Sequence, residues 1–103
     1  MIHVLATIRL NAGTRDAFLK EFQKLIPFVQ QEDGCLEYGP AIDVPIESPM
    51  QELIGDDCVV VVEKWASVDA LKAHSQAPHM ADYRIAVKDF VASVQLRVLQ
   101  PVG

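Results

Sequence analysis

The chain has 103 residues, half of them hydrophobic, and a formal net charge of −5. This length predicts one domain over residues 1–103, with enough apolar residues to build a core. Lys and Arg are not clustered, so nucleic acid and anionic membranes are not expected as partners, and no apolar run approaches the length of a membrane-spanning helix.

The chain opens directly into a strand pattern, because apolar and mixed side chains alternate over residues 2–10. No signal peptide precedes this strand, so we expect a cytoplasmic protein. Thr14 is a good N-cap for the helix that follows, whose apolar residues recur at helical spacing. Pro27 falls inside that pattern and should kink or tighten the last turns, and Gly34 should stop the helix.

Two further strands are expected over residues 35–42 and 58–65. The second of them holds four consecutive valines, which indicates burial on both faces, in a central strand or a dimer contact. Between them, residues 43–57 contain two prolines, a glycine and several acids, and we expect a long loop with one helical turn at residues 50–54. A loop of this length is either functional or a solvated insertion.

The last third of the chain predicts two helices and a strand. Ser67 should cap the first helix, and Pro78 fits the first turn of the second. The apolar stripe of the second helix runs from Met80 to Phe90 or Val91. In the final strand Val94, Leu96 and Val98 alternate with polar or mixed residues, a pattern with a period of two.

The order β-α-β-β-α-α-β matches the ferredoxin-like split βαβ arrangement of the α+β class. Helices would then cover one face of a four-stranded antiparallel sheet. The other face would carry Leu5, Thr7 and two of the valines, which is too apolar to face water. We therefore expect a homodimer joined through the sheets.

Glu63 and Trp65 share one face of their strand, since side chains alternate along it. A carboxylate after four valines should be partly buried, so it needs a donor or a proton, and His74 or His79 is the natural donor. A purely structural Glu–His pair would explain the same pattern. Trp65 either fills the core or forms one wall of a cleft.

His74 lies on the inward stripe of its helix and is the best candidate for a general base, because an imidazole titrates at about pH 6.5 when unperturbed. A satisfied core histidine is the alternative. His79 begins the next helix, whose dipole disfavours the imidazolium. The spacing of the two histidines is not that of a helical zinc site, so no metal is expected.

Tyr38 and Tyr83 could line the same cleft. Arg84, beside Tyr83, could bind an anionic oxygen of a ligand, although a lone helical arginine is commonly a surface charge. The sequence contains no Gly-rich phosphate loop and no nucleotide motif, so no flavin, nicotinamide or other cofactor is expected.

Two blocks of the sequence resemble the antibiotic biosynthesis monooxygenase (ABM) family. Residues 32–38 resemble its E-x-G-C-L-x-Y block, and residues 62–74 resemble its E-x-W-x-S…A-L-x-x-H block. Ala77-Pro78-His79-Met80 continues the match. With the order of the elements, the resemblance covers nearly the whole chain, and residues 43–57 form an insertion relative to shorter members. Within the family, the chain resembles the branch of YgiN-like quinol monooxygenases.

The resemblance implies a dimeric α+β barrel with one cavity in each subunit. It also implies oxidation of quinols or polycyclic anthrones by O₂ without a cofactor. Haem-degrading members of the family use an Asn on the first strand, where this chain has Ala6 and Thr7, so haem degradation is not expected. Polyketide-oxidising members use Asn, Trp and Arg, of which Trp65 matches the tryptophan and Arg84 is the candidate for the arginine.

These observations predict a monooxygenase that acts on a small aromatic substrate and O₂. His74, Trp65 and Glu63 would form its catalytic group, and Tyr38, His79, Tyr83 and Arg84 would surround the substrate. Two alternatives stay open, namely a non-catalytic ligand-binding or sensing module on the same fold and another acid–base enzyme such as an isomerase.

Overall fold

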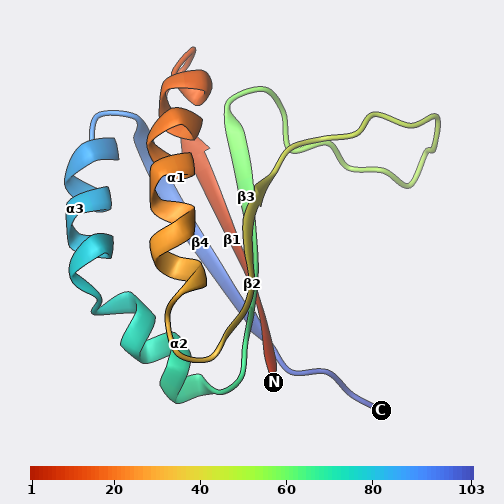
Figure 1. Cartoon of the computed structure of the whole chain (residues 1–103). Helices are drawn as coiled ribbons and strands as arrows, with labels where there is room; N and C mark the ends of the chain where they lie inside the picture. The colour runs from red at the N-terminus through yellow and green to blue at the C-terminus, as the bar shows by residue number, and fades with distance from the viewer.

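Four strands form one antiparallel sheet in the computed structural model, which describes residues 1–103. The elements follow the chain as β1 (Ile2–Leu10), α1 (Arg15–Gln30), β2 (Cys35–Ala41), β3 (Cys58–Trp65), α2 (Val68–Ser75), α3 (Pro78–Val87) and β4 (Val91–Leu99). The strand order is β2-β3-β1-β4, and the three helices lie on one face of the sheet (Figure 1). This arrangement confirms the expected ferredoxin-like α+β fold. None of the helices is both long and apolar enough to span a membrane.

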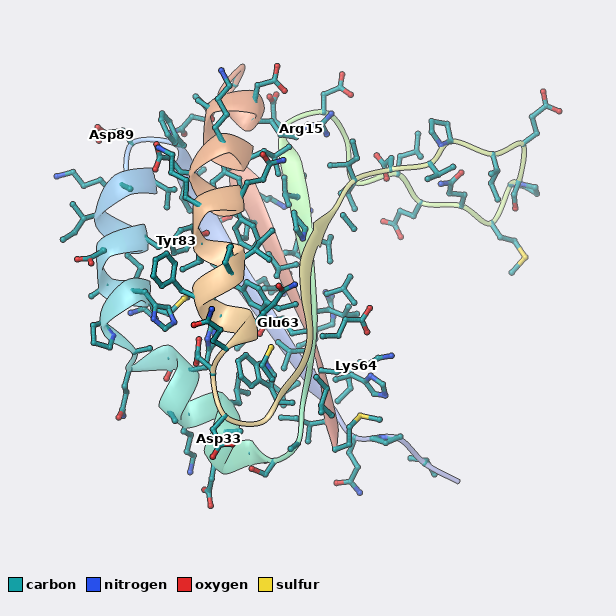
Figure 2. All side chains as sticks on the ribbon, viewed as in Figure 1. Arg15, Asp33, Glu63, Lys64, Tyr83 and Asp89 are labelled. Atoms are coloured by element: carbon teal, nitrogen blue, oxygen red, sulfur yellow. The ribbon has the colours of Figure 1, made fainter.

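The register of the two central strands decides which side chains face the helices. Val4 lies opposite Glu63, and Ile2 lies opposite Trp65. Every second residue of β1, beginning with Ile2, is buried. Glu63 points to the helix side of the sheet and Lys64 to the other side (Figure 2). The alternation expected for β3 is therefore confirmed. It places the carboxylate of Glu63 between the sheet and the helices.

Helix α1 packs on the sheet through four buried residues, Phe18, Phe22, Leu25 and Val29, spaced by three or four. It continues through Pro27 and ends at Gln30, before the position expected from Gly34. Thr14 flanks its start, but the side chain caps no helix N–H, and its hydroxyl instead donates to the carbonyl oxygen of Asn11 at 2.7 Å. Thr14 is thus the N-cap residue, as expected, but it lacks the side-chain hydrogen bond that usually makes threonine a good cap.

Gly34 fixes the turn between α1 and β2 against α2. Its φ of +83° is a left-handed conformation that suits glycine. A Cβ atom at this position would lie 2.7 Å from Cβ of Ala70. Because nothing larger than a hydrogen fits, the turn and α2 approach each other closely. This contact brings Glu32, which precedes Gly34 by two residues, next to the end of α2.

The two C-terminal helices differ from expectation at one boundary. The Ser67 side chain accepts a hydrogen bond from the backbone N–H of Ala70, which confirms the predicted cap of α2. Helix α3 ends at Val87, so the prediction that its stripe includes Phe90 or Val91 is wrong. Phe90 lies in a turn, and its carbonyl oxygen accepts a hydrogen bond from the backbone N–H of Asn11. Strand β4 begins at the next residue, Val91.

Residues 42–57 project from the sheet as a long arm, away from the helices (Figure 1). The helical turn expected at residues 50–54 is absent. The carboxylate of Asp43 accepts the backbone N–H groups of Ile54 and Gly55, and the side chain of Gln51 bonds to the backbone of Val44 and Ile46. These bonds fold the arm back on itself and take the place of helical hydrogen bonds.

Candidate active site

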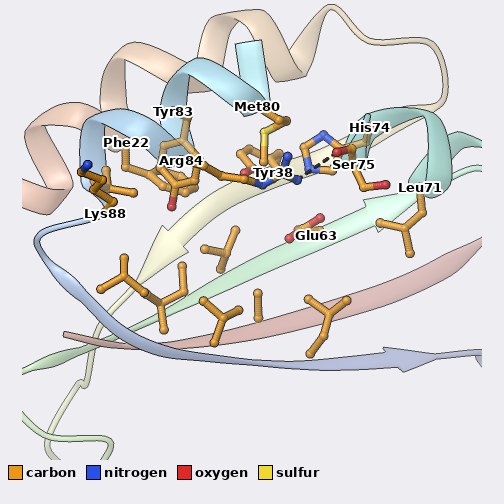
Figure 3. Close-up of a pocket in the computed structure, with 17 residues that line it drawn as sticks. Phe22, Tyr38, Glu63, Leu71, His74, Ser75, Met80, Tyr83, Arg84 and Lys88 are labelled. Carbon is orange, nitrogen blue, oxygen red and sulfur yellow. Dashed lines mark hydrogen bonds between the residues drawn. The ribbon is translucent and has the colours of Figure 1, made fainter. Parts of the chain in front are cut away.

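A cavity of about 530 Å³ lies between the helix-facing side of the sheet and helices α2 and α3 (Figure 3). Its volume falls within the usual range for sites that bind small organic molecules. Most of its wall is apolar, with Ala6, Ile8, Val61, Val94 and Leu96 contributed by the sheet. The polar side chains that reach it include Tyr38, Glu63, His74, Tyr83 and Arg84.

Glu63 is the acid of this cavity, and only 5% of it is exposed. Its Oε1 accepts the indole N–H of Trp65 at 2.9 Å, and its other oxygen has no partner in the protein. Burial raises the pKa of Glu63, while the Trp65 hydrogen bond and the nearby His74 oppose that rise. The expectation that a histidine is its donor is wrong. Trp65 follows Glu63 by two residues on the same strand face, so its indole N–H is close enough to be the donor.

The two histidines bind a different carboxylate, that of Glu32. Its Oε2 lies 2.8 Å from Nδ1 of His74 and 2.7 Å from Nε2 of His79. Glu32 lies in the turn between α1 and β2, which packs closely against α2 at Gly34. His74 follows Glu32 by 42 residues in the sequence, and His79 follows it by 47. The sequence analysis placed Glu32 in a family block without a role, because nothing in local spacing connects it to residues so far along the chain.

The bond to Glu32 determines how His74 can act. A carboxylate accepts hydrogen bonds, so Nδ1 of His74 carries the proton and Nε2 keeps a lone pair. Every buried side-chain nitrogen and oxygen in the structure has a hydrogen-bond partner, whereas Nε2 of His74 has none and is therefore accessible. Since His74 lines the cavity, this atom can take a proton from a molecule bound there.

Trp65 is fully buried and does not line the cavity. Its ring packs against His74, with centroids 4.6 Å apart and an interplanar angle of 34°. The expected stacking of Trp65 on a substrate does not fit this position, because the indole is fully buried and is not part of the cavity wall. Of the two roles considered, core packing is the one that the structure shows. Trp65 packs against the ring of His74 and donates a hydrogen bond to Glu63.

Two tyrosines form the aromatic part of the wall. Tyr38 stacks on Phe22 with centroids 5.5 Å apart, and Tyr83 meets the same ring edge-on at 5.8 Å. Burial raises the pKa of each of the two phenols above the ordinary value of a tyrosine. Neither hydroxyl has a hydrogen-bond partner in the protein, although both residues line the cavity. They are thus available as donors to a bound oxygen atom.

Arg84 and His79 occupy less central positions than expected. Nη2 of Arg84 donates to the carbonyl oxygen of Ser75 at 2.9 Å, across the cavity rim (Figure 3). His79 does not line the cavity, and it lies in a separate groove between α1 and α3. The structure holds no group of three or more His, Cys, Asp or Glu residues arranged to bind a metal ion.

Comparison with known proteins places this geometry in a family. The family model "Antibiotic biosynthesis monooxygenase" matches residues 1–85. The chain is 40% identical to "Probable quinol monooxygenase YgiN" of Escherichia coli strain K12, over 98% of each chain. In fold it is similar to PA3566 from Pseudomonas aeruginosa, with a TM-score of 0.81, 20% identity, and coverage of 99% and 94% of the two chains. It also resembles Rv0793 from Mycobacterium tuberculosis, with a TM-score of 0.79, 24% identity, and coverage of 99% and 95%.

Proposed function

The chain belongs to the antibiotic biosynthesis monooxygenase family, and we propose that it oxidises a quinol- or anthrone-like aromatic with O₂, without a cofactor. One observation carries the proposal. The accessible Nε2 of His74, which Glu32 keeps unprotonated, faces an apolar cavity large enough for a fused aromatic ring system. The name of the Escherichia coli relative supports a quinol as substrate.

In the proposed mechanism His74 removes the hydroxyl proton of a hydroquinone. The resulting anion gives one electron to O₂ far more readily than the neutral quinol, and the radical pair combines to form a carbon–oxygen bond. The peroxide then takes up a proton and loses water, as the ring carbon that bore it loses its hydrogen. One hydroquinone and one O₂ thus yield one hydroxyquinone and one H₂O, and all four electrons gained by O₂ come from the substrate.

The other cavity residues have separate tasks in this scheme. Tyr38 and Tyr83 keep their hydroxyl protons and donate hydrogen bonds to the phenolate and the peroxide oxygens. Glu63, whose pKa burial raises, can return a proton to the peroxide. Arg84, at the rim, attracts the anionic product. The apolar walls hold O₂ and the ring together and exclude water.

We propose that the working form is a homodimer joined through the sheets. The face of the sheet away from the helices exposes Leu5, Thr7, Val60 and Val62 in part, with charged side chains around them. A second copy would cover apolar surface that a protein of this size cannot bury alone.

The test is O₂ consumption by the purified, chelator-treated protein with a panel of hydroquinones and anthrones. With ¹⁸O₂, mass spectrometry should find one labelled oxygen in the organic product and one in water. Label in hydrogen peroxide alone would indicate an oxidase. Tight binding of the aromatics without O₂ consumption would overturn the proposal in favour of a ligand-binding module, and rearranged but unlabelled product would favour an isomerase.

A further inference from the structure

The cavity is open along β4, the edge strand of the sheet. Val94 and Leu96 of β4 lie beside Ile8 and Ala6 of β1, whose side chains are buried on the helix-facing side. All four residues line the cavity, yet Val94 is 59% exposed and Leu96 is 54% exposed. The part of the cavity wall that β4 contributes is therefore apolar surface that no element of the chain covers.

The arm formed by residues 42–57 carries a second apolar surface. Val44, Ile46 and Met50 are 73%, 64% and 91% exposed. The arm extends from the sheet on the side away from the helices (Figure 1), whereas the cavity lies on the helix side. The arm therefore cannot reach the cavity of its own chain, and the two apolar surfaces cannot cover each other within one subunit.

We propose that the arm of a second copy of this chain closes the open side of the cavity along β4, so that each active site of the homodimer is completed by the other subunit. Ile46 and Met50 of the arm would contact Val94 and Leu96. The inference rests on the proposed homodimer joined through the sheets, and it adds a part of the site that one subunit lacks.

The order of the strands favours this contact. Strands β2 and β4 form opposite edges of the sheet, and the arm follows β2. A two-fold axis that lies between the two sheets, parallel to the strands, places β2 of one subunit over β4 of the other. The arm returns to the sheet at Cys58, which lies opposite Arg9, and Arg9 lies opposite Ser93. This axis keeps the level along the strands, so the arm arrives beside Val94.

The arm is long enough to make the contact. It runs out and back over residues 42–57, about eight residues each way, so it can extend roughly 25 Å. Two sheets that pack face to face lie about 10 Å apart. The reach of the arm exceeds this separation, so its end can pass the edge of the neighbouring sheet and contact the helix-facing side of β4.

The charges of the two surfaces are complementary. Arg84 and Lys88 line the cavity on the side opposite the sheet (Figure 3), and neither forms an ion pair within the chain. The arm contains Asp and Glu residues but no Lys or Arg. A single surface ion pair contributes little to affinity, but opposite charges of this kind orient two surfaces. They favour a second copy of this chain as the occupant.

The first experiment is photo-cross-linking and does not depend on turnover. Benzoylphenylalanine replaces Met50, and dimers are prepared that mix ¹⁴N and ¹⁵N copies. Mass spectrometry should find peptides of mixed isotopic composition that join the arm to residues 84–98. Benzoylphenylalanine in place of Val68, on the exposed side of α2, is the matched control and should give no such link.

Two outcomes of the cross-linking would overturn the inference, and they are distinguishable. A dimer whose arm cross-links only within its own chain, or to other parts of the second copy, would overturn the closure by the arm and leave the homodimer in place. A protein that is monomeric at all concentrations would overturn both.

The second experiment is complementation between two defective variants. Ile46→Ser/Met50→Ser should remain dimeric and lose about tenfold or more in kcat/KM, because the apolar contact with β4 is lost. His74→Ala keeps an intact arm but lacks the proposed base. After subunit exchange in an equal mixture, about half of the dimers contain one copy of each variant, and each has one intact site. The rate of O₂ consumption should therefore recover to roughly a quarter of the wild-type rate.

A rate in the mixture no higher than half of that of the arm variant alone would show that the arm does not act across the dimer. A wild-type kcat/KM in the arm variant would also overturn the inference. Val68→Ser, the corresponding change outside the arm, should behave like the wild type. If the wild-type protein oxidises no quinol or anthrone, the proposed function fails, and the cross-links alone decide where the arm lies.

Discussion

Oε2 of Glu32 lies 2.8 Å from Nδ1 of His74, although 42 residues separate them in the chain. The pair gives the buried imidazole of His74 the properties of a general base. The carboxylate fixes the protonated nitrogen on one side, and the unprotonated nitrogen faces the cavity on the other. Trp65 packs behind the imidazole and limits its movement. Orientation of a histidine by a buried acid recurs in unrelated hydrolases.

Glu32→Gln should lower kcat about 100-fold with little change in KM. The amide oxygen can still accept one N–H, but it carries no charge to stabilise the imidazolium that forms during proton abstraction. Steady-state O₂ consumption measures the effect. Glu47→Gln, the same change on an exposed residue of the arm, is the control. Equal rates in the wild type and Glu32→Gln would remove Glu32 from the mechanism.

Trp65→Phe should destabilise the protein by about 1–3 kcal/mol, because Glu63 loses its only hydrogen-bond donor in a buried place. It should also raise the pKa of Glu63 further, since the indole bond is the main influence that lowers it. Chemical denaturation measures the stability, and carboxyl ¹³C shifts follow the titration. A pKa of Glu63 that falls or stays constant would show that the Trp65 hydrogen bond does not stabilise the ionised carboxylate.

Glu63→Gln should stabilise the protein at neutral pH. Burial raises the folded-state pKa of Glu63 above its unfolded value, so the folded form binds its proton more tightly. The wild type therefore loses stability as pH rises from the unfolded pKa through the folded pKa, and the loss is complete above both. The advantage of the variant should grow as pH rises above 4.5, the ordinary pKa of a glutamate, in urea titrations. An advantage that is independent of pH would point to packing.

Val62→Glu should convert the proposed dimer into a monomer, because it places a charge in the apolar part of the sheet face away from the helices. Light scattering coupled to size-exclusion chromatography reports the mass. Val68→Glu, the same change on the exposed side of α2, should leave the mass unchanged. A wild-type protein that is monomeric at all concentrations would contradict a dimer through the sheets.

Patterns with a short period predicted the fold well. The alternation in β1 and β3 and the spacing of Phe18, Phe22, Leu25 and Val29 each reflect burial on one face, which the sequence displays directly. The end of α3 was misplaced because Phe90 continues a helical stripe, whereas its backbone is bonded to Asn11, far away in sequence. The arm lacks its expected helical turn for a similar reason, since Asp43 and Gln51 bind backbone groups that local propensity would have used.

The candidate site was only partly predictable. His74, Glu63, Tyr38 and Tyr83 were expected around one cavity, and the structure brings them together there. Glu32, the partner of His74 and His79, was not predictable, because hydrogen bonds between residues 42 or 47 positions apart leave no periodic signal. The donor to Glu63 was assigned wrongly for a different reason, since Trp65 lies only two residues away on the same strand face and a histidine was expected in its place. The sequence indicated which chemical groups are present, and the fold decided how they pair.

The central claim is that His74 is the base that starts oxidation of the substrate by O₂. The most direct measurement is the rate of O₂ consumption by the metal-free wild-type protein and by His74→Ala, with the hydroquinone that the wild type oxidises fastest. We predict a loss of about 100-fold or more in kcat, with the aromatic still bound by the variant. An unchanged rate in His74→Ala, or no O₂ consumption by the wild type with any hydroquinone or anthrone, would contradict the claim.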